Sequence, residues 1–330
     1  MQIIGVAGSD ELAKVYLART KSGQLIEFVE SLQPPLPREK KWVLIVSTMY
    51  GCPVRCLFCD AGGEYKGKLS ADDILGQIEF MVKARYGSTA VPADMLKIQF
   101  ARMGEPTLNN NLLEALGQLP DRIRAPGLLP SISTVAPIKA MPFLERLLEI
   151  KNRLYPGRFQ FQFSIHTTDP GRRAELIPTP TLSLAEMADF GRRWKNSEDR
   201  KVALNFALAE GSPVDVDLLS KHFDPDIFII KITPLNPTYR ASENQLKSFI
   251  NPHRVDSQYE LIDKLKAASF EVLVSIGEVD ENLIGSNCGQ LVVRHMQNEK
   301  ELADGYTSRI EMKPDPEGES CARAGNQIRP

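Results

Sequence analysis

Short apolar runs alternate with longer segments of helical periodicity along most of the chain, from Trp42 to about residue 275. The short runs predict strands at 43–48, 95–100, 129–134, 159–164, 202–207, 227–232 and 271–274. The periodic segments predict a helix that begins after Ser70, where Asp73 completes a capping box, and helices at about 109–118, 138–153, 183–195, 214–223 and 255–268. This alternation is typical of β-α units around a parallel sheet, so we predict an α/β fold.

The two ends of the chain depart from this alternation. Residues 11–19 and 24–31 mix apolar and polar positions around a glycine-bearing turn, which predicts a β-hairpin. Prolines at 34, 35 and 37 then separate it from the rest. From about Gln297 the chain is polar, and we expect a loosely held tail. We predict a hairpin and linker at 1–40, a partial barrel at 41–276 and a C-terminal segment at 277–330.

The composition is that of an ordinary soluble protein. The 330 residues are 42% hydrophobic and 25% charged, and no apolar run approaches the roughly 20 residues that cross a bilayer. The N-terminus lacks the features of a signal peptide, and the five cysteines do not suggest a disulfide framework. We expect a cytoplasmic protein with no membrane partner. The net charge of −2 gives no general basic surplus for nucleic acid.

The strongest chemical signal is a group of three cysteines, Cys52, Cys56 and Cys59, directly after the first predicted strand. Thiolates with this spacing can hold three irons of a [4Fe-4S] cluster, and no fourth cysteine lies nearby. A zinc site usually takes four protein ligands, but Cys288 lies far downstream and the histidines show no finger spacing. The spacing resembles that of radical S-adenosylmethionine (SAM) enzymes, in which SAM itself completes the cluster. A plain electron-transfer cluster is the alternative.

A second motif narrows the resemblance. The segment Met103-Gly104-Glu105-Pro106 is similar to the Gly-Met-Gly-Glu-Pro motif of the radical SAM adenine methyltransferases that modify ribosomal and transfer RNA, and of their florfenicol-resistance relatives. Gly104 would let the backbone approach a ligand closely, and the resemblance implies that Glu105 accepts from the SAM ammonium. It also implies a partial (β/α)6 TIM-type barrel, in which chemistry collects at the C-terminal ends of the strands.

Three further predicted strand ends match the family: Ile132-Ser133-Thr134, Phe163-Ser164-Ile165-His166 and Pro234-Leu235-Asn236-Pro237. The resemblance implies that Ser133, Ser164 and Asn236 bind the carboxylate and ribose of SAM, and that His166 lines the same pocket. Phe58 stands where the family packs an aromatic residue beside the adenine. Taken singly, each of these residues would be an ordinary cap, turn or packing residue.

The motif that separates this subfamily from other radical SAM enzymes lies near the C-terminus. Asn287-Cys288-Gly289-Gln290-Leu291 is similar to the family's Ala-Cys-Gly-Gln-Leu. In that family the cysteine receives a methyl group from one SAM, and a radical made from a second SAM activates this methyl for attack on an sp2 carbon. Cysteine suits the role because its thiolate is a strong nucleophile. Cys288 is therefore the candidate catalytic residue, against the alternative of a buried structural cysteine.

Two departures limit the resemblance. The family's second catalytic cysteine lies seven residues before the first cluster cysteine, and Ile45 occupies that position here. The family's N-terminal helical RNA-binding domain is replaced by the predicted hairpin. Cys321 is the remaining cysteine, and its use as a substitute thiol is a hypothesis.

The leading prediction is a radical SAM enzyme with a [4Fe-4S] cluster that methylates an sp2 carbon through Cys288, on a substrate other than folded ribosomal RNA. Three alternatives stay open: an RNA adenine methyltransferase, a radical SAM enzyme in which Cys288 donates a hydrogen atom, and an iron-sulfur electron carrier. The resemblance implies a reductant such as flavodoxin or ferredoxin. The sequence leaves open the substrate, the oligomeric state and whether methyl transfer survives with Ile45.

Overall fold

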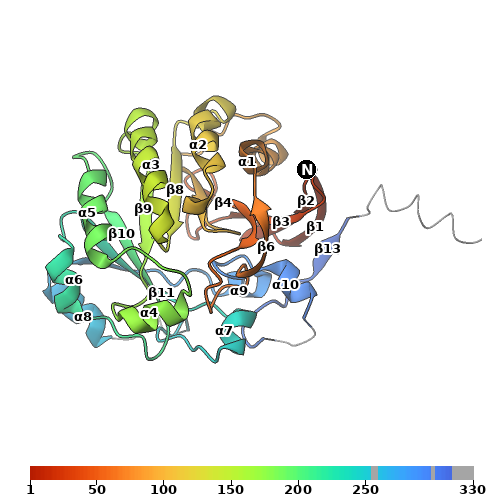
Figure 1. Ribbon diagram of the computed structural model, residues 1–330. Helices are drawn as coiled ribbons and strands as arrows, with labels where there is room; N and C mark the ends of the chain where they lie inside the picture. Colours follow the sequence, from red (N-terminus) through yellow and green to blue (C-terminus); the bar gives the residue numbers. More distant parts are fainter. Residues whose placement is uncertain (254–258, 299–301, 314–330) are drawn as a thin grey trace, which may run out of the picture.

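The computed structural model describes residues 1–253, 259–298 and 302–313, and an 11-stranded sheet runs through them (Figure 1). Its strand order is β12-β11-β10-β9-β8-β7-β4-β3-β2-β1-β13. Seven neighbouring strands are parallel: β4 (Trp42–Val46), β7 (Leu96–Phe100), β8 (Leu128–Thr134), β9 (Gln160–Ser164), β10 (Val202–Leu208), β11 (Phe228–Pro234) and β12 (Glu271–Val274). They lie at the seven predicted positions, so the α/β prediction is confirmed. Within the described residues the sheet stays open, as a partial barrel requires.

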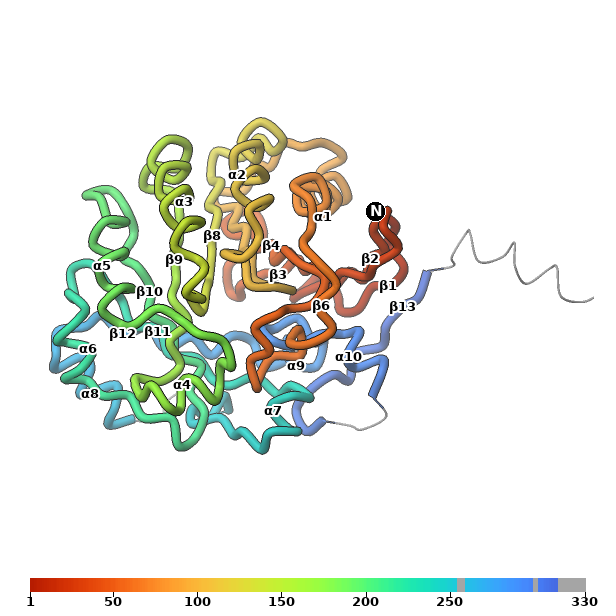
Figure 2. The backbone as a smooth tube through the Cα atoms, in the orientation of Figure 1, coloured from red at the N-terminus to blue at the C-terminus, as the bar shows by residue number. Residues whose placement is uncertain are grey.

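Helices connect the parallel strands and lie along the outside of the sheet (Figure 2). The predicted ones are α1 (Ala71–Tyr86), α2 (Asn111–Arg122), α3 (Met141–Leu154), α5 (Leu184–Trp194), α6 (Val216–His222) and α8 (Glu260–Ala267). The N-cap of α1 is formed as predicted, because the Ser70 side chain accepts from the backbone N–H of Asp73 at 3.0 Å. Four short helices were not predicted: α4 (Pro170–Leu176), α7 (Tyr239–Glu243), α9 (Asp280–Ile284) and α10 (Val292–Met296).

The parallel strands have one apolar face and one polar face. In β7, Leu96, Ile98 and Phe100 are buried in the core against the helices, whereas Lys97 and Gln99 lie on the opposite side, because successive side chains of a strand alternate. We call this opposite side the inner face. The strand registers place further polar residues on it: Ser131, Ser133, Gln160, Gln162, Ser164, Asn205 and Lys231. A polar inner face can bind polar ligands, whereas the outer face forms the core.

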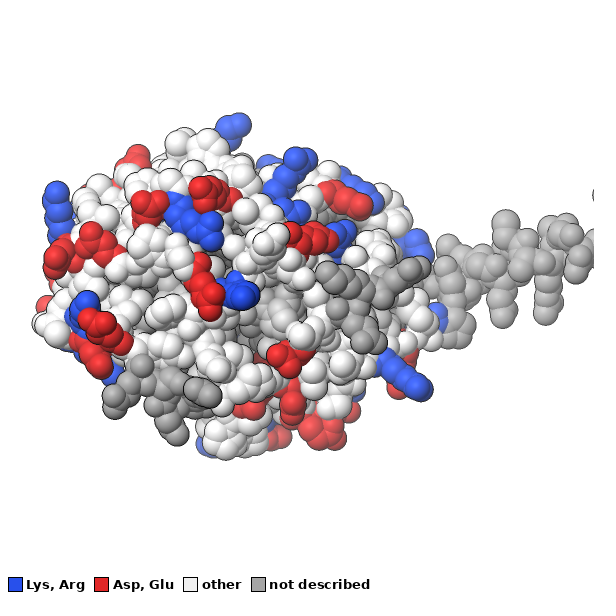
Figure 3. Space-filling model, turned by 90° about the horizontal axis from the view of Figure 1, so that it is seen from below, with Lys and Arg blue, Asp and Glu red and all other residues white. Residues whose placement is uncertain are grey.

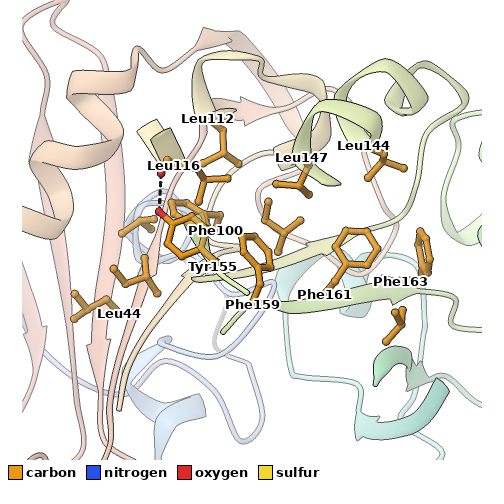
Figure 4. Packing of buried hydrophobic residues seen from close by; sticks show 14 of the residues in the cluster. Leu44, Phe100, Leu112, Leu116, Leu144, Leu147, Tyr155, Phe159, Phe161 and Phe163 are labelled. Atoms are coloured by element: carbon orange, nitrogen blue, oxygen red, sulfur yellow. Dashed lines mark hydrogen bonds between the residues drawn. The ribbon is translucent and has the colours of Figure 1, made fainter. Parts of the chain in front are cut away.

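The core between the sheet and its helices contains a row of aromatic side chains (Figure 4). Phe161 and Phe163 of β9 meet edge to face at 4.9 Å between ring centroids, and Phe161 also lies against Trp194 of α5 at 4.7 Å. Tyr155 follows α3 and donates its hydroxyl to the carbonyl of Leu116 in α2 at 2.6 Å. This hydrogen bond joins two helices beneath the surface, where a carbonyl has little access to water.

We expect Tyr155→Phe to lower the free energy of unfolding by about 1 to 2 kcal/mol, because the buried Leu116 carbonyl loses its donor while the ring packing stays. Urea denaturation of both proteins measures the change. Tyr65→Phe, at an exposed ring, is the control and should leave the midpoint unchanged. Equal midpoints for Tyr155→Phe and the unaltered chain would contradict a stabilising role of the hydroxyl.

The N-terminal strands continue the same sheet. β1 (Gln2–Gly8), β2 (Ala13–Arg19) and β3 (Leu25–Ser31) are antiparallel, and β3 pairs with β4. The predicted hairpin is β2 and β3 and is therefore confirmed, whereas β1 was not predicted. The division of the chain into 1–40, 41–276 and 277–330 stays a prediction.

The C-terminal segment contains a strand that the sequence analysis missed. Ile310–Met312 forms β13 and pairs antiparallel with β1, so the expectation of a loosely held tail from Gln297 is wrong for these residues. Cys321 lies outside the described residues. None of the described helices combines the length and apolar character needed to span a membrane.

Candidate active site

The three predicted cluster cysteines lie in the segment that follows β4. Cys52 ends β5 (Met49–Cys52), and Cys56 and Cys59 lie between β5 and β6 (Gly63–Lys68). Cys56 is buried, Cys52 and Cys59 are half-buried, and none forms a disulfide. Burial is the main cause that raises the pKa of all three thiols, to about 11 for Cys52, and the charges of neighbouring thiolates, Cys52 among them, also raise the pKa of Cys56 and Cys59. The loop therefore brings the three thiols together, as the spacing predicts.

The donor chemistry of this loop fits an iron-sulfur cluster. Thiolates are the ligands of such clusters, and binding of iron lowers the pKa of a thiol, which offsets the cost of burying a thiolate. Within the described ranges, no three or more Cys, His, Asp or Glu side chains are arranged around a position for a single metal ion. Which group the thiols hold is therefore argued below as a proposal.

Helix α7 holds the cysteine loop through its backbone. Arg240 donates to the carbonyls of Cys56 at 3.1 Å and of Arg55 and Gly62 at 3.2 Å. Thr238 donates to the carbonyl of Phe58 at 3.0 Å. These contacts join residues about 180 apart in sequence, which is why sequence patterns did not reveal Arg240. Because only carbonyls are used, the thiols stay available.

Asp60, next to the last cluster cysteine, connects the loop to the C-terminal segment. Its buried carboxylate accepts from the backbone N–H groups of Tyr239 at 3.2 Å and Arg240 at 3.0 Å, and from the Tyr306 hydroxyl at 2.8 Å. The Tyr306 hydroxyl in turn accepts from the backbone N–H of Leu291 at 2.8 Å. Asp60 is thus a positioning residue that sequence reasoning missed.

Gly104 and Glu105 follow β7 and lie against the start of the cysteine loop. Gly104 has φ of 104°, and a Cβ there would lie 2.6 Å from the Cβ of Met49, so only glycine fits. Glu105 is buried and accepts from the hydroxyls of Thr107 and Thr134 at 2.6 Å each. Burial raises the pKa of Glu105, and these hydrogen bonds oppose the rise. Glu105 is fixed in place before any ligand binds.

The predicted serines lie on the inner face, Ser164 at the end of β9 and Ser133 one residue before the end of β8. Ser133 pairs in register with Gln162, and Ser164 pairs with Asn205. Both serines are half-buried, and the Oδ1 atom of buried Asn205 has no hydrogen-bond partner in the described part of the chain. Polar atoms left free at one edge of the sheet can accept a polar ligand such as SAM.

His166 and Phe58 lie together, with ring centroids 4.8 Å apart. His166 has φ of 66°, and its Nδ1 accepts from the backbone N–H of Ala207 at 3.1 Å. Burial lowers the pKa of His166 to about 3, so the ring is neutral at physiological pH. Asn236 instead donates to the carbonyl of Cys288 at 2.9 Å. Its side chain therefore contacts the loop of the candidate catalytic residue, and SAM binding by Asn236 stays a prediction.

Cys288 lies in the loop between α9 and α10 and is brought next to the cysteine loop. The backbone N–H of Asp60 donates to the carbonyl of Gly289 at 2.8 Å, and a charge on Cys288 raises the pKa of Cys59. The Cys288 residue is exposed, yet burial raises the pKa of its thiol, while Lys231 and Arg102 lower it.

A buried ion pair holds this loop on the sheet. Arg102, after β7, donates to the Glu27 carboxylate of β3 at 2.7 Å, and both side chains are almost completely buried. Arg102 also donates to the carbonyls of Gly285 at 2.9 Å and of Ser286 and Asn287 at 3.3 Å. Arg102 stands where the family motif has glycine. We call Arg102 and Glu27 the loop clamp, and the sequence analysis missed it.

The position of the family's second cysteine is apolar here. Ile45 lies in β4, in register with Val29 and Gln99. Its side chain packs against a buried apolar cluster that includes Val29, Ile284 and Val292. The site therefore offers no thiol at this position.

The comparisons with known proteins agree with the predicted resemblance. No family model matches the chain. A probable dual-specificity RNA methyltransferase RlmN of Chlorobium phaeobacteroides is 27% identical over 278 residues, which cover 81% of this chain and 71% of that protein. The corresponding protein of Deinococcus deserti is 26% identical over 292 residues, covering 84% and 77%.

A solved structure shows the same fold. It is a radical SAM methyltransferase from Sphaerobacter thermophilus, with a TM-score of 0.67 and 22% identity, and the match covers 88% of this chain and 82% of that chain. The resemblance to radical SAM methyltransferases that the motifs indicated is thus confirmed in sequence and in fold.

Proposed function

We propose that this homologue of the RlmN-type methyltransferases is a radical SAM methyltransferase that carries the methyl group on Cys288 and delivers it to an sp2 carbon. The observation that supports this most directly is that Cys288 lies beside the cysteine loop, although it stands 229 positions after Cys59 in the sequence. When bound, a [4Fe-4S] cluster and SAM would supply the methyl group and the one-electron chemistry.

The protein side chains have distinct roles in this proposal. Cys52, Cys56 and Cys59 hold the cluster, and Glu105 offers its carboxylate to the SAM ammonium. Ser133, Ser164 and Asn236 orient the rest of SAM by hydrogen bonds, with Phe58 and His166 against the adenine.

Cys288 acts as the nucleophile that accepts the methyl group. Its thiol must first lose a proton, because the thiolate is the reactive form. Lys231 and Arg102 lower the pKa of Cys288 and so favour the thiolate, against the effect of burial. With Ile45 in place of a second cysteine, the release of product from Cys288 must follow a route other than attack by a thiol at that position.

Two observations bear on the acceptor. The relatives named above are described as RNA methyltransferases, which supports RNA as the acceptor class. In contrast, the face of the molecule seen from below, where α4 and α7 lie, has basic side chains interspersed with acidic ones (Figure 3). An extended RNA is usually bound on a continuous basic surface, so we keep RNA as the second candidate beside a smaller acceptor.

Mass spectrometry after anaerobic incubation with methyl-labelled SAM tests the proposal. We expect the label on the peptide that contains Cys288, and 5'-deoxyadenosine after addition of a reductant. Cys288→Ala is the control, and it should remain unlabelled. Deoxyadenosine without labelled Cys288 would mean a radical enzyme that does not transfer methyl groups. If cluster-loaded protein forms neither labelled Cys288 nor deoxyadenosine, an electron carrier becomes the better interpretation.

A further inference from the structure

Tyr306 stands in the part of the chain that the sequence analysis expected to be loosely held, yet its side chain is only 5% exposed. Its φ is 46°, a left-handed backbone conformation that is unusual for a bulky residue. Such a conformation costs free energy and persists only where surrounding contacts fix it, and it is often found at functional sites. The contacts of Tyr306 show what this strained residue supports.

The Tyr306 hydroxyl joins the two loops of the candidate site. It donates to Oδ2 of Asp60, the residue that follows the last cluster cysteine, at 2.8 Å. It also accepts from the backbone N–H of Leu291, shortly after Cys288, at 2.8 Å. One oxygen atom thus connects a side chain of the cysteine loop to the backbone of the Cys288 loop. It therefore limits how far the two loops can move apart.

The Tyr306 ring packs on two helices. It stacks on His295 of α10, with ring centroids 5.1 Å apart, and on Tyr239 of α7 at 5.4 Å. The Tyr239 hydroxyl and Nδ1 of His295 share a hydrogen bond of 2.7 Å. Gly285 leaves room for the ring, because a Cβ there would lie 2.6 Å from Cε1 of Tyr306. The ring thus contacts both the helix that binds the cysteine loop and the helix that follows Cys288.

The backbone of Tyr306 adds a contact with α9. Its N–H donates to the carbonyl of Asn282 at 2.9 Å. The same carbonyl accepts from the side chain of Gln290, in the loop of Cys288, at 3.1 Å. Asn282 precedes Cys288 and Leu291 follows it, so the chain on both sides of Cys288 is attached to Tyr306.

We propose that Tyr306 is a positioning residue for methyl transfer, which holds the Cys288 thiol at a fixed distance from the cysteine loop. Tyr306 acts through other residues, through Asp60 on one side and through the Cys288 loop on the other. The inference rests on the proposed function, because it takes Cys288 to be the methyl carrier. For a reacting group that must meet a bound cofactor, a misplacement of about 1 Å can cost a large factor in rate.

Anaerobic labelling of Cys288 from methyl-labelled SAM, in cluster-loaded Tyr306→Phe protein, tests this role. The substitution removes both hydrogen bonds of the hydroxyl and keeps the ring. We expect the labelling rate at saturating SAM to fall at least about tenfold, while the SAM concentration that gives half of this rate stays within about twofold. The visible absorption of the cluster should be unchanged, because the hydroxyl bonds to Asp60 and Leu291 and not to a cysteine.

Two controls separate positioning from a general loss of stability. Tyr155→Phe also removes the hydroxyl of a buried tyrosine, so its Tm should fall comparably, yet its labelling rate should be unchanged. Thr307→Ala alters the exposed residue next to Tyr306 and should change neither the Tm nor the labelling rate. Equal labelling rates in Tyr306→Phe and the unaltered chain overturn the proposal, and so does an equal loss of rate in Tyr306→Phe and Tyr155→Phe.

Hydrogen exchange distinguishes this inference from the proposed function. In Tyr306→Phe the backbone N–H of Leu291 loses its acceptor, so we expect the amides of residues 286–291 to exchange at least about tenfold faster. Tyr155→Phe should leave their exchange unchanged. Faster exchange in Tyr306→Phe, with Cys288 unlabelled even in the unaltered chain, would remove methyl transfer and keep Tyr306 as the support of this loop. Labelled Cys288 with unchanged exchange and an unchanged rate would do the reverse.

Discussion

Cys56→Ala is expected to reduce SAM cleavage to background and to abolish the visible absorption of an iron-sulfur cluster. The proposed cluster has three protein thiolates, so losing one leaves two irons without a protein ligand. The fold should survive, because Arg240 binds the carbonyl of Cys56 and not its thiol. Anaerobic iron and sulfide analysis, circular dichroism and assay of 5'-deoxyadenosine together measure the outcome.

Cys288→Ala is the matched control for this variant. It also removes one cysteine, but it should keep the cluster absorption, because Cys288 is not among the proposed ligands. A Cys56→Ala protein that still cleaves SAM at a normal rate would show that the loop does not hold the cluster. Loss of the cluster in Cys288→Ala would instead make Cys288 a ligand.

Arg102→Met is expected to slow the methylation of Cys288 by at least about tenfold and to destabilise the protein by about 3 to 5 kcal/mol. The substitution leaves the Glu27 carboxylate buried without its ion-pair partner, and this accounts for the loss of stability. It also frees the carbonyls of Gly285, Ser286 and Asn287. The adjacent Cys288 then loses its fixed position, and misplacement of a reacting group is costly for the rate.

A double-mutant cycle with Glu27→Gln tests the loop clamp as a pair. The combined loss should be smaller than the sum of the single losses, because residues in one hydrogen-bonded network are not additive. Arg193→Met is the control, since Arg193 pairs with Glu145 at the surface at 2.7 Å and exposed pairs contribute about 1 kcal/mol or less. Additive losses, or an Arg102→Met protein as stable as Arg193→Met, would contradict the clamp.

Local patterns predicted most of the fold because each β-α unit is coded within one stretch of chain. The seven parallel strands and six of the helices lie where the periodicity predicts them. β13 was missed because its three residues have no pattern of their own and pair with β1, some 300 residues earlier. α7 and α9 were missed for a related reason, since helices of five residues are too short to show a period.

The candidate site also contains residues that local patterns predicted and residues that they did not. Motifs identified the residues expected to touch the cofactor, such as Cys52, Glu105 and Cys288, because the chemistry limits the residue types. The residues that position them, Glu27, Arg102 and Asp60, were not found. Their contacts join distant segments, and a glutamate in a strand or an arginine after one has no local signature. The sequence thus predicted the groups expected to react, whereas the structure was needed to find the residues that hold those groups in position.

The hydrogen bonds between α7 and the cysteine loop affect how the holoenzyme is assembled. Many metal sites form only as the metal orders the chain, so part of the binding free energy is used to fold the ligand loop. Here the loop is already ordered by Arg240 and Thr238 through carbonyl groups. The cluster is therefore expected to enter a preorganised binding loop, and little of its binding free energy should be used to fold the chain. The loop of the unloaded protein should have the same conformation when a cluster is delivered to it.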